Sequence, residues 1–269
     1  MEAALPLRKK SRDRVLTPTI ELKEMTKLSV NMNKIALLRN SRGRDFPNII
    51  VYAKKLIALG VQGITVHPRQ DERHITRKDA YELGELLSQN PAVEFNIEGY
   101  PSEDFLVLVE KIKPTQCTLV PDNPQQLTSD HGWDLEKDGD LVQGICARLN
   151  AADIRSVLFL DPDVSLVKLV PETGARRVEI YTEEYAASFN TPDHNAVFAG
   201  YKNAALEAQR LGIGVNAGHD LDLVNLPQFL TIDGILEVSI GHALTIECID
   251  QGMQSVIRSY LDICATQVD

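Results

Sequence analysis

Two Gly-His pairs near the C-terminus have an evident chemical use. Gly218 and His219 lie in "GVNAGHDL" (214–221), and Gly241 and His242 lie in "VSIGHAL" (238–244). Glycine lets a backbone approach a bound anion closely, and a histidine can exchange a proton near neutral pH. The repeated dipeptide, at the end of two β-rich runs, therefore indicates a site that binds a phosphate and moves protons.

Other titratable side chains lie toward the ends of earlier β-rich runs. His67 and Arg69 occur in "GITVHPR" (63–69), Glu98 in "VEFNIEG" (93–99) and Glu179 in "RRVEIYT" (176–182). A buried carboxylate needs partners or its pKa rises, and groups with different pKa values can act as acid and base in one reaction. A single histidine is more often structural than catalytic, so the shared position at strand ends is what favours an acid–base site.

A bound metal is a rival use of histidine and glutamate, but the spacing disfavours it. The sequence contains neither H-x-H nor H-E-x-x-H, and no pair among its four cysteines has C-x-x-C spacing. We therefore expect no metal. We interpret the cysteines as small core residues of a protein from a reducing compartment.

Eight short β-rich runs alternate with helical patterns or loop-rich connections. The runs are 27–33, 63–69, 93–99, 116–121, 154–161, 176–182, 214–218 and 235–241. This alternation predicts a (β/α)8 TIM barrel of the α/β class, with catalytic groups at the carboxyl ends of the strands. A doubly wound open sheet is the alternative, although no G-x-G-x-x-G follows the first strand. Pro47 and Gly60 bracket the first expected helix, and an apolar stripe from Ile249 to Cys264 predicts one last helix.

Several strands carry polar residues where barrel interiors usually hold Val, Ile and Leu. Ser29, Asn31 and Asn33 alternate with apolar residues in the first run, and the runs at 63–69, 93–99 and 176–182 alternate in the same way. Alternate side chains of a strand share a face. In a barrel the polar set would face the interior, whereas in an open sheet it would face solvent. The helical patterns between the strands favour the inward arrangement, because these helices must cover the apolar set.

Length and charge limit the class of protein. The 269-residue chain has a formal net charge of -10 and 43% hydrophobic residues, which disfavours nucleic-acid or anionic-membrane partners and allows a sizeable core. No apolar run approaches the roughly 20 residues that span a bilayer, and the first 25 residues lack the apolar segment of a signal peptide. We expect an N-terminal extension over 1–25, one barrel domain over 26–269, and a cytoplasmic location.

Longer motifs sharpen these expectations. They are "VNMNKIALLRNSRG" (30–43), "GITVHPRQDERHIT" (63–76), "FNIEG" (95–99), "KPTQCTLVPDNPQQLTSDHGWDL" (113–135), "VEIYTEEYA" (178–186), "VNAGHDL" (215–221) and "SIGHA" (239–243). With them the sequence resembles the pyridoxine 5'-phosphate synthase family of vitamin B6 biosynthesis, from about residue 27 to its end. The resemblance implies a (β/α)8 barrel in a homo-octamer, without metal or organic cofactor. It also implies the condensation of 1-deoxy-D-xylulose 5-phosphate with 3-amino-2-oxopropyl phosphate to pyridoxine 5'-phosphate, phosphate and water.

The resemblance further implies a role for each motif residue. Glu98 matches the principal proton acceptor, His67 a second acid/base group and His219 the proton donor. Glu179 matches a group that stabilises the transition state. The positions matched to substrate contacts are Asn31 and Arg42 for the aminoketone phosphate; Asn33, Lys34, Arg69, His74 and Thr128 for deoxyxylulose phosphate; and Gly218, Asp220, Gly241 and His242 beside the phosphate. Thr128 falls in the non-periodic stretch 121–140, which is long enough to act as a lid.

The chain departs from the family pattern at a few positions. Asn33 and Lys34 stand where many members have Asp-His, Pro68 where Leu is usual, and Asp220 where Gly is usual. Lys34 can neutralise a phosphate but cannot accept a proton as a neutral histidine can. Two other functions stay open: another phosphate-binding barrel enzyme, such as an isomerase or a Schiff-base aldolase using Lys34, and a non-catalytic binding protein. The retained acid–base residues argue against a non-catalytic binding protein.

Overall fold

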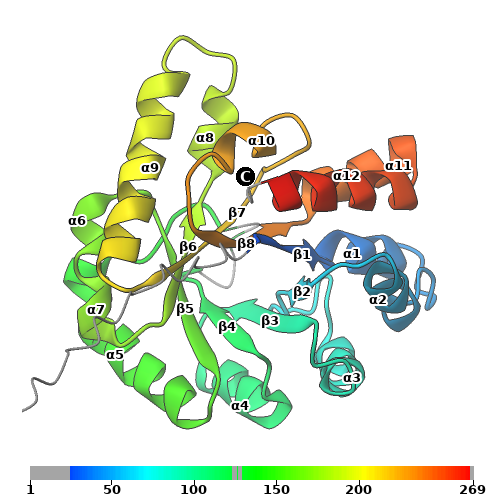
Figure 1. Cartoon of the computed structure of the whole chain (residues 1–269). Helices are drawn as coiled ribbons and strands as arrows, with labels where there is room; N and C mark the ends of the chain where they lie inside the picture. Colours follow the sequence, from blue (N-terminus) through cyan, green and yellow to red (C-terminus); the bar gives the residue numbers. More distant parts are fainter. Residues whose placement is uncertain (1–24, 123–125, 127–128, 267–269) are drawn as a thin grey trace, which may run out of the picture.

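Eight parallel strands close into a barrel in sequence order (Figure 1). The computed structural model describes residues 25–122, 126 and 129–266. The strands are β1 (Lys27–Asn31), β2 (Gly63–Val66), β3 (Glu94–Gly99), β4 (Gln116–Leu119), β5 (Arg155–Leu160), β6 (Arg177–Tyr181), β7 (Gly214–Gly218) and β8 (Ile235–Ile240). All eight predicted strands are present, so the predicted (β/α)8 barrel is confirmed and the open-sheet alternative is wrong.

Helices surround the barrel and cover its outer face (Figure 1). They are α1 (Asn33–Asn40), α2 (Ile49–Ala58), α3 (Arg77–Ser88), α4 (Glu103–Ile112), α5 (Leu135–Ala151), α6 (Val164–Val167), α7 (Val170–Thr173), α8 (Glu183–Ser188), α9 (His194–Arg210), α10 (Leu226–Phe229), α11 (His242–Gln251) and α12 (Met253–Ala265). Within the described ranges, no helix is long and apolar enough to span a bilayer. The prediction that one helix lies between Pro47 and Gly60 is confirmed by α2. Asn48 is its N-cap, and Gly60 follows its end at a φ of 98°.

The first strand is shorter than predicted, and a helix replaces its end. β1 stops at Asn31, and Asn33 is the first residue of α1, so Asn33 does not share a strand face with Ser29 and Asn31. The Asn31 side chain stabilises the turn, because its Oδ1 accepts a hydrogen bond from the Asn33 N–H at 3.0 Å. Such local side-chain bonds compete with the β ladder and start helices.

The prediction of one last helix that includes both Ile249 and Cys264 is wrong. Gly252, at a φ of 86°, separates α11 from α12, a backbone conformation that favours glycine. After this break Val256 and Ile257 are buried in α12, whereas Ile249 in α11 is 67% exposed. The apolar stripe therefore continues in sequence although its two parts lie on helices of different direction.

Hydrogen bonds across the barrel show that the polar strand faces point inward. Gln116 on β4 donates through Nε2 to Glu237 Oε1 on β8, the strand on the far side, at 2.8 Å. Thr118 on β4 donates through Oγ1 to Glu179 Oε2 on β6 at 3.3 Å. Strands that are not neighbours can make such contacts only through the interior, so the predicted inward arrangement is confirmed.

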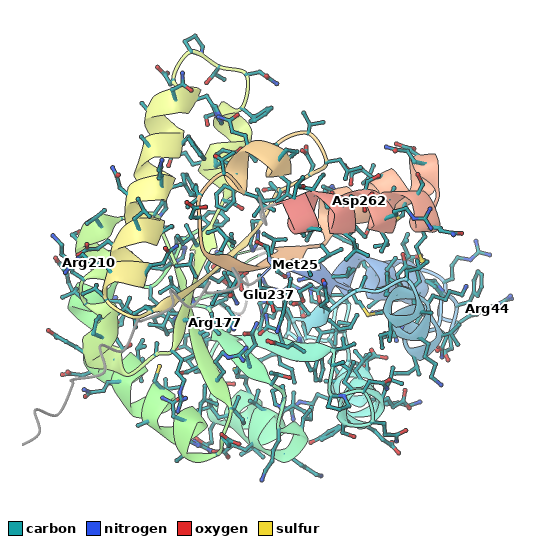
Figure 2. The ribbon with its side chains drawn as sticks, viewed as in Figure 1. Met25, Arg44, Arg177, Arg210, Glu237 and Asp262 are labelled. Carbon is teal, nitrogen blue, oxygen red and sulfur yellow. The ribbon has the colours of Figure 1, made fainter. Side chains whose placement is uncertain are left out.

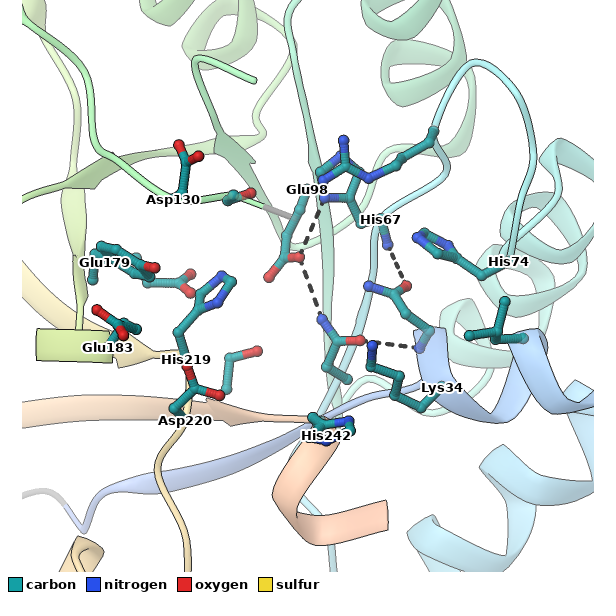
Figure 3. A pocket seen from close by; sticks show the side chains of 18 residues that line it. Lys34, His67, His74, Glu98, Asp130, Glu179, Glu183, His219, Asp220 and His242 are labelled. Atoms are coloured by element: carbon teal, nitrogen blue, oxygen red, sulfur yellow. Dashed lines mark hydrogen bonds and ion pairs between the residues drawn. The ribbon is translucent and has the colours of Figure 1, made fainter. Parts of the chain in front are cut away.

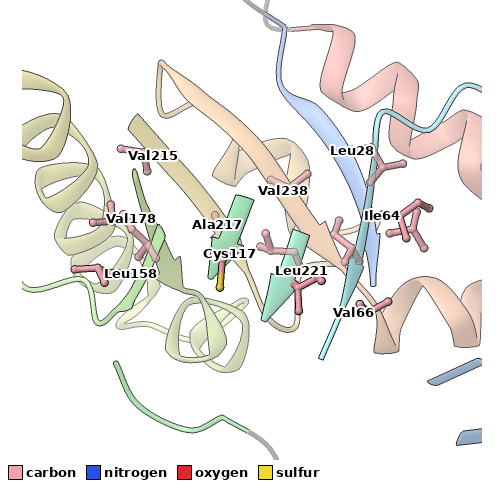
Figure 4. Packing of buried hydrophobic residues seen from close by; sticks show 14 of the residues in the cluster. Leu28, Ile64, Val66, Cys117, Leu158, Val178, Val215, Ala217, Leu221 and Val238 are labelled. Carbon is pink, nitrogen blue, oxygen red and sulfur yellow. The ribbon is translucent and has the colours of Figure 1, made fainter. Parts of the chain in front are cut away.

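The other face of each strand is apolar and packs against the helices (Figure 4). Leu28, Ile64, Val178 and Val238 are fully buried there. Full burial of one such side chain stabilises a fold by about 1.5–3 kcal/mol. The core therefore lies between sheet and helices, which leaves the interior free for polar chemistry.

Glu237 is a buried carboxyl near the amino-terminal end of the barrel interior and is labelled in Figure 2. We expect it to give folding stability an unusual pH dependence. Burial, followed by the charge of Glu94, raises the pKa of Glu237 to about 7. The unfolded chain releases this proton at lower pH, so folding stability is lost as pH rises toward and through 7. The loss is on the order of 3 kcal/mol of unfolding free energy between pH 4 and pH 8. Urea denaturation should show Glu237→Gln to be more stable than the wild type at pH 8.

The same comparison at pH 4 should show little difference, because Glu237 is then protonated in both folded and unfolded chains. Glu85→Gln, on the exposed side of α3, serves as the matched control and should change the stability by no more than about 0.5 kcal/mol. A Glu237→Gln protein that loses stability with rising pH as steeply as the wild type would contradict the prediction.

Candidate active site

One cavity of about 630 Å³ opens at the carboxyl ends of the strands and collects most of the predicted site residues (Figure 3). Twelve of the fifteen predicted residues line it: Asn31, Asn33, Lys34, His67, Arg69, His74, Glu98, Glu179, His219, Asp220, Gly241 and His242. They come from strands or following loops spread around the barrel. Barrel closure therefore brings together groups that lie up to about two hundred residues apart in sequence.

Three predicted residues are not among those lining the cavity. Arg42 is exposed in the turn between α1 and α2. Thr128 lies outside the described residues. Gly218 ends β7 behind the cavity wall, where an added Cβ would lie 2.5 Å from Glu179 Oε1. The absence of a side chain at Gly218 therefore leaves room for the Glu179 carboxylate.

Glu98, at the end of β3, lies between Asn31 and His67, one a hydrogen-bond donor and the other a close titratable neighbour (Figure 3). Its Oε2 accepts from Asn31 Nδ2 at 3.3 Å and lies 3.8 Å from His67 Nδ1. Burial raises the pKa of Glu98, the charge of Asp122 raises it further, and Arg69 opposes both. A carboxyl with a raised pKa can both take up and release a proton near neutral pH.

His67, just after β2, is held as a neutral imidazole beside Glu98. Its backbone N–H donates to Asn33 Oδ1 at 2.9 Å, so the start of α1 fixes the loop that follows β2. Burial lowers the pKa of His67 well below its usual value, and the charge of Arg69 adds to this effect. A neutral histidine can accept a proton from a reacting group.

Glu179, on β6, is a second buried carboxyl on the other side of the cavity. Burial raises its pKa well above the usual range, and the charge of Glu98 adds to the effect. Two carboxylates that repel each other through a low-dielectric interior do not ionise together readily. Their repulsion therefore favours the protonated form of at least one of the two carboxyls.

Gly218→Ala is expected to displace the Glu179 carboxylate, because the new Cβ would overlap Oε1 and approach Ser239 O to 3.3 Å. Misplacement of a catalytic group by about 1 Å can lower turnover roughly 100-fold. Steady-state kinetics should show this loss while circular dichroism shows the native fold. Gly200→Ala, in α9 with no neighbouring atom within 4 Å, is the matched control and should keep full activity. Wild-type turnover by Gly218→Ala would contradict the prediction.

His219, after β7, occupies a strained turn. His219 and Asp220 have φ values of 84° and 56°, and such left-handed residues cost energy unless they are glycine. The Thr182 hydroxyl holds the turn by donating to Gly218 O at 2.6 Å. The His219 ring packs against Phe159 and Tyr181, with ring centroids 5.2 and 5.1 Å away.

The strained turn gives a physical reason to expect glycine more readily than aspartate at position 220. The charge of Asp220 also has an electrostatic effect on the neighbouring imidazole. Burial lowers the pKa of His219, and the Asp220 carboxylate is the largest influence opposing that decrease. Asp220 thus favours the protonated form that a proton donor needs.

Phosphate groups have several possible partners at the mouth of the cavity. The N-termini of α1 and α11 both border it, at Asn33 and His242. Backbone N–H groups at helix N-termini attract anions. Lys34 and Arg69 add positive charge. An added Cβ at Gly241 would lie 3.0 Å from Asn31 Cβ and would crowd that side chain.

Sequence reasoning missed Tyr181, Asp130, Ser239 and Ser129, which also line the cavity. Asp122 was missed as well, although its position directly after the β4 run is the same signal that identified His67. Among residues 25–122, 126 and 129–266, no group of three His, Cys, Asp or Glu side chains is placed to hold a metal ion.

The chain is similar in sequence to proteins of one family. The family model described as "Pyridoxal phosphate biosynthesis protein PdxJ" matches residues 28–266. Two proteins named "Pyridoxine 5'-phosphate synthase", from Bacteroides fragilis and Christiangramia forsetii, are 49% and 47% identical to this chain. These alignments cover 88% and 89% of this chain and 98% and 99% of theirs. A protein of the same name from Agrobacterium fabrum is 45% identical over 88% of this chain and 97% of its own.

Solved structures share the fold at low sequence identity. A mutant tryptophan synthase alpha-subunit from Pyrococcus furiosus has a TM-score of 0.61 at 10% identity, over 91% of this chain and 99% of that one. Phosphoribosyl anthranilate isomerase from Thermotoga maritima has a TM-score of 0.58 at 13% identity, over 90% and 100%. These two likenesses show the barrel fold alone. The family match over residues 28–266, together with relatives at 45–49% identity, shows that the chain belongs to the PdxJ family of pyridoxal phosphate biosynthesis proteins.

Proposed function

We propose that this chain is a pyridoxine 5'-phosphate synthase. It would condense 1-deoxy-D-xylulose 5-phosphate with 3-amino-2-oxopropyl phosphate and release pyridoxine 5'-phosphate, phosphate and water. The observation that carries the proposal is the group formed by His67, Glu98, Glu179 and His219 around one cavity of a PdxJ-family barrel. Their environments move their pKa values in different directions, as a reaction with several proton transfers requires.

Each group has a step that suits its environment. The amine of one substrate attacks the ketone of the other to give an imine, and enolisation, loss of phosphate, loss of water and ring closure follow. Glu98 accepts a proton and can return it, with His67 beside it as a neutral second base. His219 donates a proton from the opposite side, and Glu179 stabilises charge that develops in the transition state.

Binding both phosphates would supply much of the acceleration. Lys34, Arg69 and the N-termini of α1 and α11 lie on the rim of the cavity. Holding two reactants in register converts a bimolecular step into one that is effectively unimolecular. In this proposal Lys34 contributes charge where many relatives would offer a histidine, so proton transfer on that side falls to His67 and His74.

The test is direct product formation. Purified protein incubated with both phosphates should yield pyridoxine 5'-phosphate, identified by absorbance and mass, together with one equivalent of inorganic phosphate. Failure to form this product would contradict the proposal.

Lys34 lines the cavity, so borohydride trapping with substrate tests the alternative of a Schiff-base aldolase. The homo-octamer and the cytoplasmic location stay predictions.

A further inference from the structure

A buried carboxylate outside the predicted set links two walls of the cavity. Asp122 follows β4 and is 2% exposed. Its Oδ2 accepts from Arg69 Nη2 at 2.6 Å and from the Ser129 hydroxyl at 2.8 Å. Arg69 belongs to the loop after β2 and Ser129 to the segment after β4, and both line the cavity. One oxygen atom therefore fixes two lining groups from different parts of the barrel.

The ion pair between Asp122 and Arg69 lies away from solvent. The side chains of Arg69 and Asp122 are 7% and 2% exposed. Attraction between buried charges is screened weakly, and removal of one partner leaves the other uncompensated. Asp122 thus restricts the orientation of Arg69, which would otherwise be a long side chain with many rotamers.

Asp122 also contributes to the charge around the central carboxyl group. The titratable groups facing Glu98 are His67 and Arg69 after β2, Asp122 after β4, Glu179 on β6 and Glu237 on β8. After burial, the charge of Asp122 is the largest influence raising the pKa of Glu98. Asp122 also opposes the lowering of the His219 pKa.

We propose that Asp122 is a positioning residue of this active site, which holds the Arg69 guanidinium and the Ser129 hydroxyl in place for the phosphorylated substrate. The assignment of Arg69 to deoxyxylulose phosphate rests on the proposed function. The contact itself does not, because the structure shows Arg69 Nη2 donating to Asp122 Oδ2 directly. Asp122 would act through Arg69 and Glu98 without itself exchanging a proton with substrate.

The experiment compares Asp122→Asn, Asp122→Ala and Asp122→Glu with the wild type. Asp122→Asn should raise the KM for deoxyxylulose phosphate roughly 10-fold more than that for the aminoketone, since a charge-assisted bond is lost. Asp122→Ala should lower kcat/KM roughly 100-fold, because Arg69 is no longer oriented. Asp122→Glu should recover most of the activity. Asp140→Asn, on an exposed part of α5, is the matched control and should behave as the wild type.

A pH profile separates positioning from a merely structural effect. Loss of the Asp122 charge lowers the pKa of Glu98, so the acidic limb of kcat/KM should move to lower pH in Asp122→Asn and stay in place in Asp122→Glu. Histidine NMR of the unliganded protein should show a lower pKa for His219 in Asp122→Asn, with His219→Gln assigning the signal.

The proposal is overturned if folded Asp122→Asn matches the wild type in both KM values, in the pH limb and in the His219 titration. It is also overturned if Asp122→Glu is as impaired as Asp122→Asn. If the wild type formed no pyridoxine 5'-phosphate, the proposed function would fail. The NMR titration and thermal unfolding of the same variants would still decide the role of Asp122, because neither needs turnover.

Discussion

Glu98→Gln should reduce turnover by roughly 1,000-fold while both substrates still bind, a loss within the range that general acid–base catalysis contributes. The substitution keeps the shape of the side chain, and its amide oxygen can still accept from Asn31 Nδ2. It removes the proton exchange that the raised pKa of Glu98 makes available. Single-turnover kinetics should show the loss in the chemical step, and calorimetry should show wild-type affinity for each substrate within a few-fold.

The pH dependence of the wild type belongs to the same prediction. Because burial raises the pKa of Glu98, its basic form appears only above the usual carboxyl range, and kcat/KM should rise with pH there. Glu237→Gln is a demanding control, since it removes another buried carboxyl of the barrel interior, one that adds to the raised pKa of Glu98 but does not line the cavity. It should retain most of its turnover. Comparable losses in the two variants, or an active Glu98→Gln, would contradict the role of Glu98.

Arg39→Met should lower the free energy of unfolding by about 3–5 kcal/mol, the cost of leaving one member of a buried ion pair alone. Arg39, on α1, contacts both Asp79 oxygens, with Nη2 and Oδ2 2.8 Å apart. Asp79 also forms the capping box of α3 with Thr76. The same Nη2 donates to His74 O at 3.2 Å, so activity should fall together with stability. Urea denaturation and the KM for deoxyxylulose phosphate are the measurements.

Arg44→Met is the matched control for Arg39→Met. Arg44 is exposed in the turn between α1 and α2 (Figure 2), and its replacement should change the free energy of unfolding by no more than about 0.5 kcal/mol. If Arg39→Met were as mild as Arg44→Met, the pair with Asp79 would not hold α1 against the start of α3.

The sequence alone predicted the fold class and most of the residues that line the cavity. Strand and helix periodicities are local properties, so eight β-rich runs separated by helical patterns predicted the barrel. The alternation of polar and apolar residues predicted the inward polar face for the same reason. Position at a strand end identified His67, Glu98 and His219, because parallel strands in a barrel all end at one mouth. These positions could be predicted without knowing which groups touch.

Only the tertiary structure decided which groups act on one another. A pKa depends on burial and on charges from distant segments, so the raised pKa of Glu98 could not be inferred from its neighbours in sequence. Pairs such as Arg69 with Asp122 and Arg39 with Asp79 join segments 53 and 40 residues apart. The role of Gly218 depends on Glu179 across a strand pair, and the start of the helix at Asn33 is stabilised by the bond that its N–H donates to Asn31 Oδ1. Local patterns carry the positions of the residues, whereas the closed barrel supplies the low dielectric and the distances that determine their chemistry.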